Sequence, residues 1–406
     1  MPLPRPRPPP PLMDELVEEI LLRLPPDKPA SLVRAALVSK RWCRLVSDAG
    51  FRRRFRDFHR TPPIIGYLWD LEIIDHVVRF LPAPSSGLSL ADHRDMRVRD
   101  ARHGRVLLQA CGKKYYGCPY SGFIVWDPIT DVQIKLPDAP SLKHLQSWTV
   151  AVLCAAGVAC DHLHCRGGPF MVVVVGTTRE KLFSYVYSSE SDMWSGPNLS
   201  PCGDVDITWA RSAVVGNSVY FISGNDGGDR ILEYDLQTRQ VAIIELPELE
   251  EPLGELTSTE DGRLGYIDVQ GYKVSLWSMC KTNEIYRWEL NKVIDLEKLP
   301  LHGIRSTEPC LVGVAEGLDV IFLAERDKFV AVDLKSEKTT MVHGGFRDHP
   351  RVVVSPYVNF YTPVSANTSC RNSRHRQGIP GTDKGSEAED TRMLATARRH
   401  SIVWQH

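Results

Sequence analysis

One short segment of this sequence concentrates side chains that could bind a metal ion. It contains Cys154, Cys160, His162, His164 and Cys165. Cysteine and histidine are the usual zinc ligands, but structural zinc sites usually combine two Cys or His pairs separated by an ordered spacer. Here the 160/165 pair leads directly into the apolar run 172–175, and no second pair follows. We therefore expect a loop with buried thiols between two strands, and neither a metal nor another cofactor.

Arginine and phenylalanine side chains alternate between positions 51 and 60, as they could on a nucleic-acid-binding surface. The basic residues are Arg52, Arg53, Arg54, Arg56, His59 and Arg60, and the aromatic ones are Phe51, Phe55 and Phe58. Arginines can contact phosphates, and aromatic rings can stack on bases. The phenylalanines recur at helical spacing, however, which favours the buried face of a helix. We interpret the arginines as a solvated helix face, or one that faces an acidic partner.

Signatures of nucleotide-binding and hydrolytic enzymes are missing from the sequence. It contains no Gly-x-Gly-x-x-Gly, no Gly-x₄-Gly-Lys-Ser/Thr, no His-Glu-x-x-His and no Gly-x-Ser-x-Gly motif. We therefore predict that the chain has no catalytic residues and is not an enzyme.

The arginine-rich segment ends a stretch with helical periodicity, residues 12–60. Aliphatic side chains recur at every fourth position: Leu12, Leu16, Ile20 and Leu24. Pro25 ends this first helix, because proline disfavours helical geometry at the residue before it. Ser31 can cap a second helix and Ser39 a third, followed by a fourth that carries the arginines. About fifty residues bury little core on their own, so we expect a partner to complete this unit.

From Pro62 onward the pattern changes to short strands separated by polar turns. A strand–turn–strand pattern recurs with turns at positions 127, 188, 235, 278 and 333. Asp127, Asp235 and Asp333 occupy the same place in this repeat, which indicates turn chemistry rather than an active site. A period near 40–50 residues is typical of a β-propeller. We predict an antiparallel propeller of five or six blades, with residues 64–81 starting a sixth blade or completing the last one.

The two ends of the chain lack the composition of a packed core. Residues 1–11 contain seven prolines and are predicted to form an extended, disordered leader. Residues 364–406 are rich in Ser, Arg and Gly and are predicted to be a disordered tail. The predicted domains are therefore the leader, a helical domain at 12–60, a β domain at 61–363 and the tail.

Charge and cysteine content indicate the kind of protein. Residues 1–60 are basic, with 13 Lys and Arg against 7 Asp and Glu. The whole chain, however, has a net charge of −1, and this near-neutral charge excludes a polycation that coats nucleic acid or membrane. The ten cysteines are scattered, and no apolar signal segment or membrane-spanning run is visible. We expect a soluble protein with free thiols in the nucleus or the cytoplasm.

The N-terminal helical unit resembles an F-box. Residues 12–26 look like the opening helix of that family, and residues 32–48 like its second half, including the Val-x-Lys-Arg-Trp sequence at 38–42. Met13 stands where the family usually has a proline. The junction 59–63 and the segment 160–170 are similar to those of the large set of plant (grass-type) F-box proteins that carry a C-terminal β-rich associated domain. The fold class implied is α+β and multi-domain: a small helical F-box followed by a β-propeller-like domain.

The resemblance implies a substrate receptor of a Skp–cullin–F-box ubiquitin ligase. The F-box would bind a Skp-type adaptor, and through it cullin and RING subunits, while the β domain would hold an unknown target protein. The residues expected to serve adaptor binding are Leu12, Leu16, Ile20, Leu21, Leu24, Pro25, Leu32, Val38, Trp42 and Leu45. Two alternatives stay open. One is an enzyme that uses the propeller channel, which requires converging histidines and carboxylates. The other is a nucleic-acid-associated factor that uses the cluster Arg52–Arg60.

Overall fold

A computed structural model describes residues 12–363 of the chain, with short gaps. The gaps are 72–76, 84–85, 87–91, 112–119, 140–141, 143–144, 158–159, 179–180, 202–205, 209, 225–229, 250–252, 283–284, 302–307, 326–327 and 345–351. The predicted leader 1–11 and tail 364–406 lie outside the described residues. No helix in the described part of the chain has the length and apolar character needed to cross a membrane.

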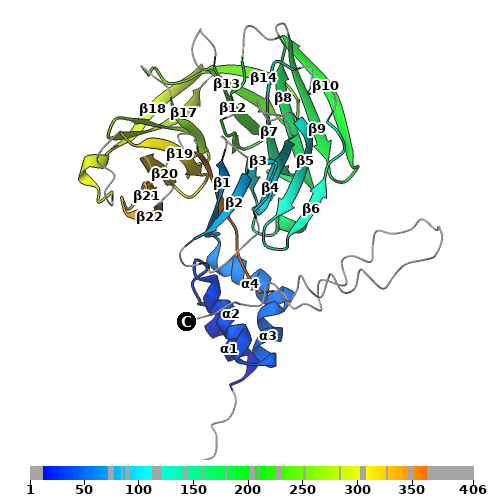
Figure 1. The fold of residues 1–406 in the computed structure, drawn as a ribbon, viewed down its shortest axis with the longest axis vertical. Coiled ribbons are helices and arrows are strands. Elements are labelled where there is room, and N and C mark those ends of the chain that lie inside the picture. The colour runs from blue at the N-terminus through cyan, green and yellow to red at the C-terminus, as the bar shows by residue number, and fades with distance from the viewer. Residues whose placement is uncertain are drawn as a thin grey trace, which may run out of the picture. The chain divides into compact units, whose positions relative to one another are not determined.

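Four helices form the N-terminal unit (Figure 1): α1 (Asp14–Leu22), α2 (Pro29–Val38), α3 (Lys40–Ser47) and α4 (Ala49–His59). The third helix is capped as predicted, because Ser39 Oγ accepts the Trp42 N–H at 3.1 Å. The predicted cap of the second helix is wrong: α2 begins at Pro29, whose fixed φ suits the first helical position. Ser31 therefore lies inside the helix.

The helical unit has a core of its own. Its buried side chains are Val17, Leu21, Leu22, Leu32, Ala35, Val46, Phe51 and Phe55, joined by Phe360 from the far end of the described chain. The Phe55 and Phe360 rings meet edge to face, with centroids 6.2 Å apart. Phe58 does not belong to this core, contrary to its helical spacing, since 56% of it is exposed.

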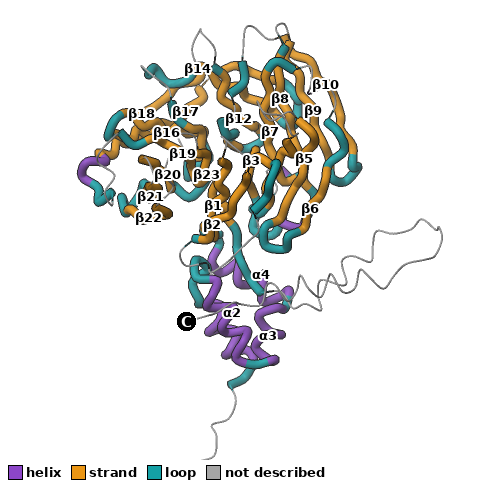
Figure 2. Tube along the Cα trace, in the orientation of Figure 1, coloured by secondary structure: helices purple, strands orange, loops and turns teal. Residues whose placement is uncertain are grey.

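The β domain consists of six antiparallel sheets, confirming a propeller with six blades (Figure 2). The first three blades contain β3 (Met96–Arg102), β4 (Arg105–Cys111), β5 (Tyr120–Asp127) and β6 (Val132–Lys135); β7 (Ser147–Cys154), β8 (Phe170–Thr177), β9 (Lys181–Ser188) and β10 (Met193–Pro201); and β11 (Ala213–Val215), β12 (Ser218–Ser223), β13 (Arg230–Asp235) and β14 (Val241–Glu245). The next two contain β15 (Glu255–Ser258), β16 (Leu264–Gln270), β17 (Lys273–Thr282) and β18 (Ile285–Asp295); and β19 (Cys310–Ala315), β20 (Val320–Glu325), β21 (Lys328–Asp333) and β22 (Thr339–Gly344).

The sixth blade closes the ring by joining distant parts of the sequence. It pairs β23 (Val352–Val358) with β1 (Ile64–Leu71), which in turn pairs with β2 (Val77–Pro82). The innermost strand of this blade is thus the last strand in the described part of the chain, and β1 and β2 lie outside it (Figure 2). Tyr357 Oη donates to the carbonyl of Gly104 at 3.0 Å, which ties the sixth blade to the first. Closure removes the exposed strand edges that an open array of short strands would leave.

The predicted turns are confirmed at four of the five repeats. The carboxylate of Asp127 accepts the Ile129 N–H at 3.0 Å. The carboxylates of Asp235 and Asp333 likewise each accept the backbone N–H of the residue two positions later. Ser188 Oγ accepts the Glu190 N–H in the same way at 3.3 Å. The turn placed at position 278 is wrong: Ser278 is fully buried in the middle of the ten-residue strand β17.

The described cysteines differ in part from the expected buried free thiols. Cys154 is free and buried, but Cys310 is free and exposed. Cys111 is disulfide-bonded.

Candidate functional site

An apolar stripe lies uncovered along helix α1. Leu12, Leu16 and Ile20 are spaced four residues apart, so they share one face, and each is about half exposed (51%, 48% and 53%). The neighbouring face, about 100° around the helix, carries Val17 and Leu21, each 1% exposed, into the helical core. The helix is therefore apolar on two faces, and in the described chain only one of them is covered.

Two further apolar side chains extend this exposed surface from α2. Leu37 and Val38 are 68% and 65% exposed at the end of that helix. Three residues after Val38, Arg41 at the start of α3 donates to Asp14 Oδ1 at 2.5 Å and to the Leu12 carbonyl at 2.7 Å. These contacts bring the end of α2 and the start of α1 together. We call Leu12, Met13, Leu16, Ile20, Leu37 and Val38 the F-box stripe.

The structure separates the ten predicted adaptor-binding residues into three groups. The exposed ones are Leu12, Leu16, Ile20, Pro25 and Val38; the partly buried ones are Leu24, Trp42 and Leu45; and the buried ones are Leu21 and Leu32. The partly buried three pack against the helical core. Met13 and Leu37 are exposed members of the stripe that the sequence analysis did not include among the adaptor-binding residues.

The arginine cluster on α4 is partly engaged within the chain. Arg54 Nε donates to Glu18 Oε1 on α1 at 2.6 Å. Arg56 Nη1 lies 3.4 Å from Nδ1 of His164, which belongs to the β7–β8 connection. Burial lowers the pKa of Arg56, and the nearby charges of Arg166 and Arg52 act in the same direction. These contacts leave a smaller free basic surface than the sequence suggests.

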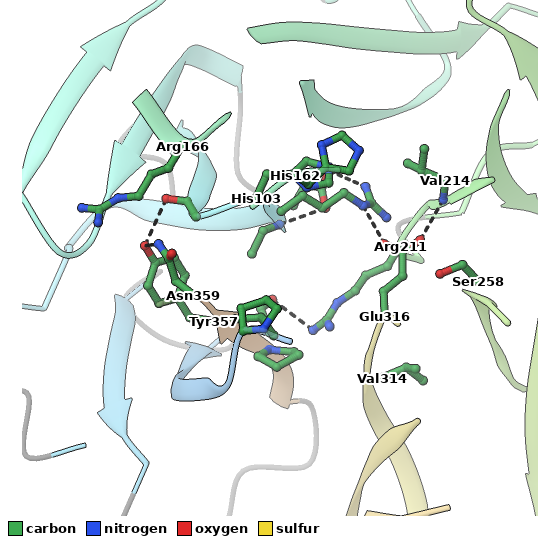
Figure 3. A pocket seen from close by; sticks show the side chains of 18 of the residues that line it. His103, His162, Arg166, Arg211, Val214, Ser258, Val314, Glu316, Tyr357 and Asn359 are labelled. Atoms are coloured by element: carbon green, nitrogen blue, oxygen red, sulfur yellow. Dashed lines mark hydrogen bonds and ion pairs between the residues drawn. The ribbon is translucent and has the colours of Figure 1, made fainter. Parts of the chain in front are cut away.

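A cavity of about 350 Å³ lies where the innermost propeller strands end (Figure 3). Residues at or just beyond the carboxyl ends of five inner strands line it: Arg102, Val214, Ser258, Glu316 and Val358. Arg56 and Arg60, from α4 and the residue after it, also line it, as do His162 and Leu163 from the β7–β8 connection. This end of the channel therefore meets the helical unit.

A buried charge network crosses this end of the channel. Arg102 donates to Asp100 Oδ2 at 2.6 Å and to Glu316 Oε2 at 2.8 Å, and it also donates to Ser212 Oγ at 2.9 Å. Asp100 accepts the Val152 N–H at 2.8 Å, and Glu316 accepts the Val214 N–H at 2.8 Å. Burial raises the pKa of Asp100, and Arg102 opposes that shift. The network thus links the inner strands of four blades through one guanidinium group.

The channel histidines do not form an acid–base pair with these carboxylates. The rings of His103 and His162 stack with centroids 3.8 Å apart (Figure 3). Burial, together with the charges of His162 and nearby arginines, lowers the pKa of His103 to about 3. A catalytic base works best with a pKa near the ambient pH, so His103 is poorly suited to that role near neutrality. The carboxylates Asp100 and Glu316 are engaged by Arg102 and by backbone N–H groups.

Four of the five metal-ligand residues of the sequence analysis come together at the end of β7. The sulfur atoms of Cys154, Cys160 and Cys165 and a ring nitrogen of His162 all lie within 4.8 Å of one another. The fifth residue, His164, points elsewhere: its Nε2 donates to Asp57 Oδ1 on α4 at 2.9 Å. Burial, with the neighbouring Cys154 and Cys160 sulfurs, raises the pKa of the Cys165 thiol to about 12.

Comparison with protein families identifies the class to which this fold and surface belong. An F-box-like model matches residues 14–57, which cover nearly all of the four helices and four of the six residues of the exposed stripe. A model described as F-box protein AT5G49610-like, beta-propeller, matches residues 97–364. The chain belongs to this family of F-box proteins with a β-propeller. Such proteins are typically non-catalytic subunits of ubiquitin ligases, and the combination of the two domains indicates a substrate receptor.

A curated relative agrees with this assignment. F-box protein At5g03970 of Arabidopsis thaliana is 25% identical over 296 residues, which cover 67% of this chain and 66% of the relative. The match thus spans slightly less than two thirds of that protein.

Solved structures of other classes share low similarity with the chain. A DUF4784 family protein from Bacteroides caccae is 11% identical, with a TM-score of 0.40. The match covers 72% of this chain and 74% of the Bacteroides chain. A chain of the nidogen/laminin complex is 12% identical, with a TM-score of 0.38. The match covers 71% of this chain and 97% of the chain in that complex.

Proposed function

We propose that this protein is the substrate receptor of a Skp–cullin–F-box ubiquitin ligase. In this proposal the F-box stripe binds a Skp-type adaptor, which links the chain to cullin and RING subunits, and the propeller holds a target protein. The observation that carries the proposal is the exposed apolar stripe on an F-box-like unit whose other face is already packed.

The size of the stripe supports a role in stable binding. Scattered exposed apolar residues are normal on protein surfaces, but six large ones on a helical unit of about fifty residues are typical of an interaction site. Full burial of one such side chain contributes about 1.5–3 kcal/mol. The stripe also has a charged border: Arg41 and Arg23 form exposed ion pairs with Asp14 and Glu19. An apolar centre with a polar rim is the common anatomy of a protein interface.

The opposite end of the propeller is the better candidate for target binding. Alternate connections of an antiparallel sheet lie at alternate ends, so the β10–β11, β14–β15 and β18–β19 connections start and end away from the helical unit. They run from 202 to 212, from 246 to 254 and from 296 to 309. At the near end the β3–β4 and β11–β12 turns span only 103–104 and 216–217, and the longer β7–β8 connection, 155–169, is already packed against the helical unit. Long loops on a rigid scaffold commonly carry recognition residues.

A non-catalytic role fits the channel chemistry. At the near end of the channel, Arg102 forms ion pairs with both Asp100 and Glu316, and this arrangement suits a group that stabilises the ring. The ubiquitin-transfer chemistry would belong to other subunits of the ligase.

Two finer points belong to the same proposal. The junction 59–63 and the segment 160–170 support membership of the grass-type group of plant F-box proteins. Most of the described cysteines are free thiols although Cys111 is disulfide-bonded, and on this balance we propose action in the nucleus or the cytoplasm.

Affinity capture from plant tissue tests the proposal. The full chain should recover a Skp-type adaptor and a cullin together with target proteins. The exposed-face variant Leu16→Asp/Ile20→Asp should lose adaptor and cullin but keep the targets. The control Leu199→Asp changes a leucine on the propeller strand β10 that is 54% exposed, and it should recover all of them. Recovery of adaptor by the double variant at the wild-type level would refute the proposal.

A further inference from the structure

We propose that Cys154, Cys160, His162 and Cys165 form a structural zinc site that fixes the β7–β8 connection against the F-box unit. Cys154 is the last residue of β7 and is 5% exposed, and the other three lie on the connection that follows. Their four ligand atoms lie within 4.8 Å of one another. We call these four residues the Cys₃His cluster.

The dimensions of the cluster suit tetrahedral zinc. With Zn–S near 2.3 Å and Zn–N near 2.0–2.1 Å, a tetrahedral site separates sulfur from nitrogen by about 3.6 Å and two sulfurs by about 3.8 Å. The Cys165 Sγ and His162 Nδ1 atoms are 3.6 Å apart. The 4.8 Å limit on all pairs means that shifts of about 1 Å or less would complete the tetrahedron. Three thiolates and one imidazole are a ligand set that selects zinc over the hard cations magnesium and calcium.

The local backbone is shaped to bring these ligands together. His162 has a positive φ of 59°, which reverses the chain between Cys160 and Cys165. Asp161 Oδ1 accepts the Leu163 N–H at 3.1 Å and so supports this reversal. The backbone N–H of His162 is directed at Cys160 Sγ, 3.4 Å away, as an N–H donor would be toward a thiolate that binds a metal.

The surroundings provide the charge that such a site needs. Zinc with three thiolates and a neutral imidazole carries one net negative charge. Arg105 is 4% exposed, and its Nη2 donates to the carbonyls of Cys165 and Gly168. Its Nη1 is buried and has no hydrogen-bond partner. A buried cation with a free donor beside three sulfurs is costly in itself and is balanced by an anionic metal centre.

The position of the ligands gives the metal a structural role. Leu163 and His164 are the two residues between the ligands His162 and Cys165. Leu163 packs against the F-box core, and His164 donates to Asp57 on α4 at 2.9 Å. A metal bound on both sides of this dipeptide would hold the two side chains that contact the helical unit.

The sequence analysis considered these four residues together with His164 and did not expect a metal there. The spacing Cys-x₅-Cys-x-His-x₂-Cys contains no two separated pairs of the usual kind. Cys154 joins the cluster only because β7 ends beside the returning loop.

Metal analysis of the full chain, co-purified with a Skp-type adaptor under reducing conditions and without chelators, tests the proposal. Elemental analysis for zinc, iron and copper should find about one zinc per chain. X-ray absorption at the zinc edge should find three sulfurs at about 2.3 Å and one nitrogen at about 2.0–2.1 Å. These two measurements need no variant, so they decide the matter even if the variants fold poorly.

Matched variants locate the metal. Cys160→Ser and Cys165→Ser should each lower the zinc content at least roughly fivefold. Cys310→Ser, which changes an exposed free thiol outside the cluster, and His164→Ala should keep the wild-type content. Removing zinc with a chelator should speed hydrogen exchange in residues 160–169 and in α4, whereas His164→Ala should affect α4 alone.

Three results would overturn the zinc site. The first is a wild-type chain with less than about a tenth of a zinc per molecule, or with iron or copper in its place. The second is zinc that remains when Cys160 and Cys165 are both replaced by Ser. The third is mass spectrometry that finds Cys154, Cys160 or Cys165 in a disulfide in the freshly purified protein.

Discussion

Replacement of Phe360 by alanine should destabilise the F-box unit while leaving the propeller intact. Phe360 follows the last strand of the propeller, yet its side chain is 3% exposed inside the F-box core and meets Phe55 edge to face. A buried Phe→Ala change costs about 3–5 kcal/mol. A helical unit of about fifty residues is stable by only about 2–7 kcal/mol. The variant therefore removes most of the stability of the F-box unit.

Hydrogen exchange resolved by peptide measures this effect. In Phe360→Ala, exchange in residues 14–59 should accelerate by roughly 10²- to 10⁴-fold, whereas exchange in the propeller strand β8 should stay the same. Phe58→Ala is the matched control, because Phe58 lies on α4 and is 56% exposed, and it should change stability by less than about 0.5 kcal/mol. A double-mutant cycle with Phe55→Ala should give a coupling of about 0.5–1.5 kcal/mol. Equal exchange in the Phe360→Ala and Phe58→Ala variants would refute the shared core.

Three further predictions concern stability. Ser39→Ala should cost about 1 kcal/mol in chemical denaturation of the F-box unit because it removes the cap of α3, while Ser31→Ala should cost clearly less. Burial raises the pKa of Asp268, so its carboxylate destabilises the fold as pH rises from 3.8 through that raised pKa. Asp268→Asn should therefore raise the free energy of unfolding at pH 7, measured by chemical denaturation, and give no gain below pH 3.8. A chain that ends after residue 351 lacks β23 and should lose the cooperative melting transition of the propeller, whereas one that ends after Pro363 should keep it.

The propeller was largely predictable because its signals are local. Four of the six blades repeat a strand, an Asp or Ser turn and a second strand, and these turn residues hydrogen-bond their own backbone in the structure. The repeat failed at Ser278 because β17 extends over ten residues and carries no such turn there. The ring closure could only be suspected, since the pairing of β23 with β1 joins segments nearly 300 residues apart.

The functional surfaces were less predictable, because they depend on tertiary packing. Periodicity identified the aliphatic residues of the F-box but could not say which face is covered, so exposed Ile20 and buried Leu21 were predicted together. Phe360 joins the helical core from the other end of the chain, and no local pattern indicates that. The Cys₃His cluster likewise depends on the place where β7 ends.

Calorimetric titration of the purified chain with a Skp-type adaptor tests the central claim most directly. The wild type should bind with a measurable dissociation constant. Leu16→Asp/Ile20→Asp removes two half-exposed side chains from the stripe and places two charges there, for a loss of at least about 4 kcal/mol, or roughly 10³-fold in affinity. Leu199→Asp should bind like the wild type. If the wild type does not bind the adaptor, or if the double variant binds it as tightly as the wild type, the F-box stripe is not the adaptor-binding surface.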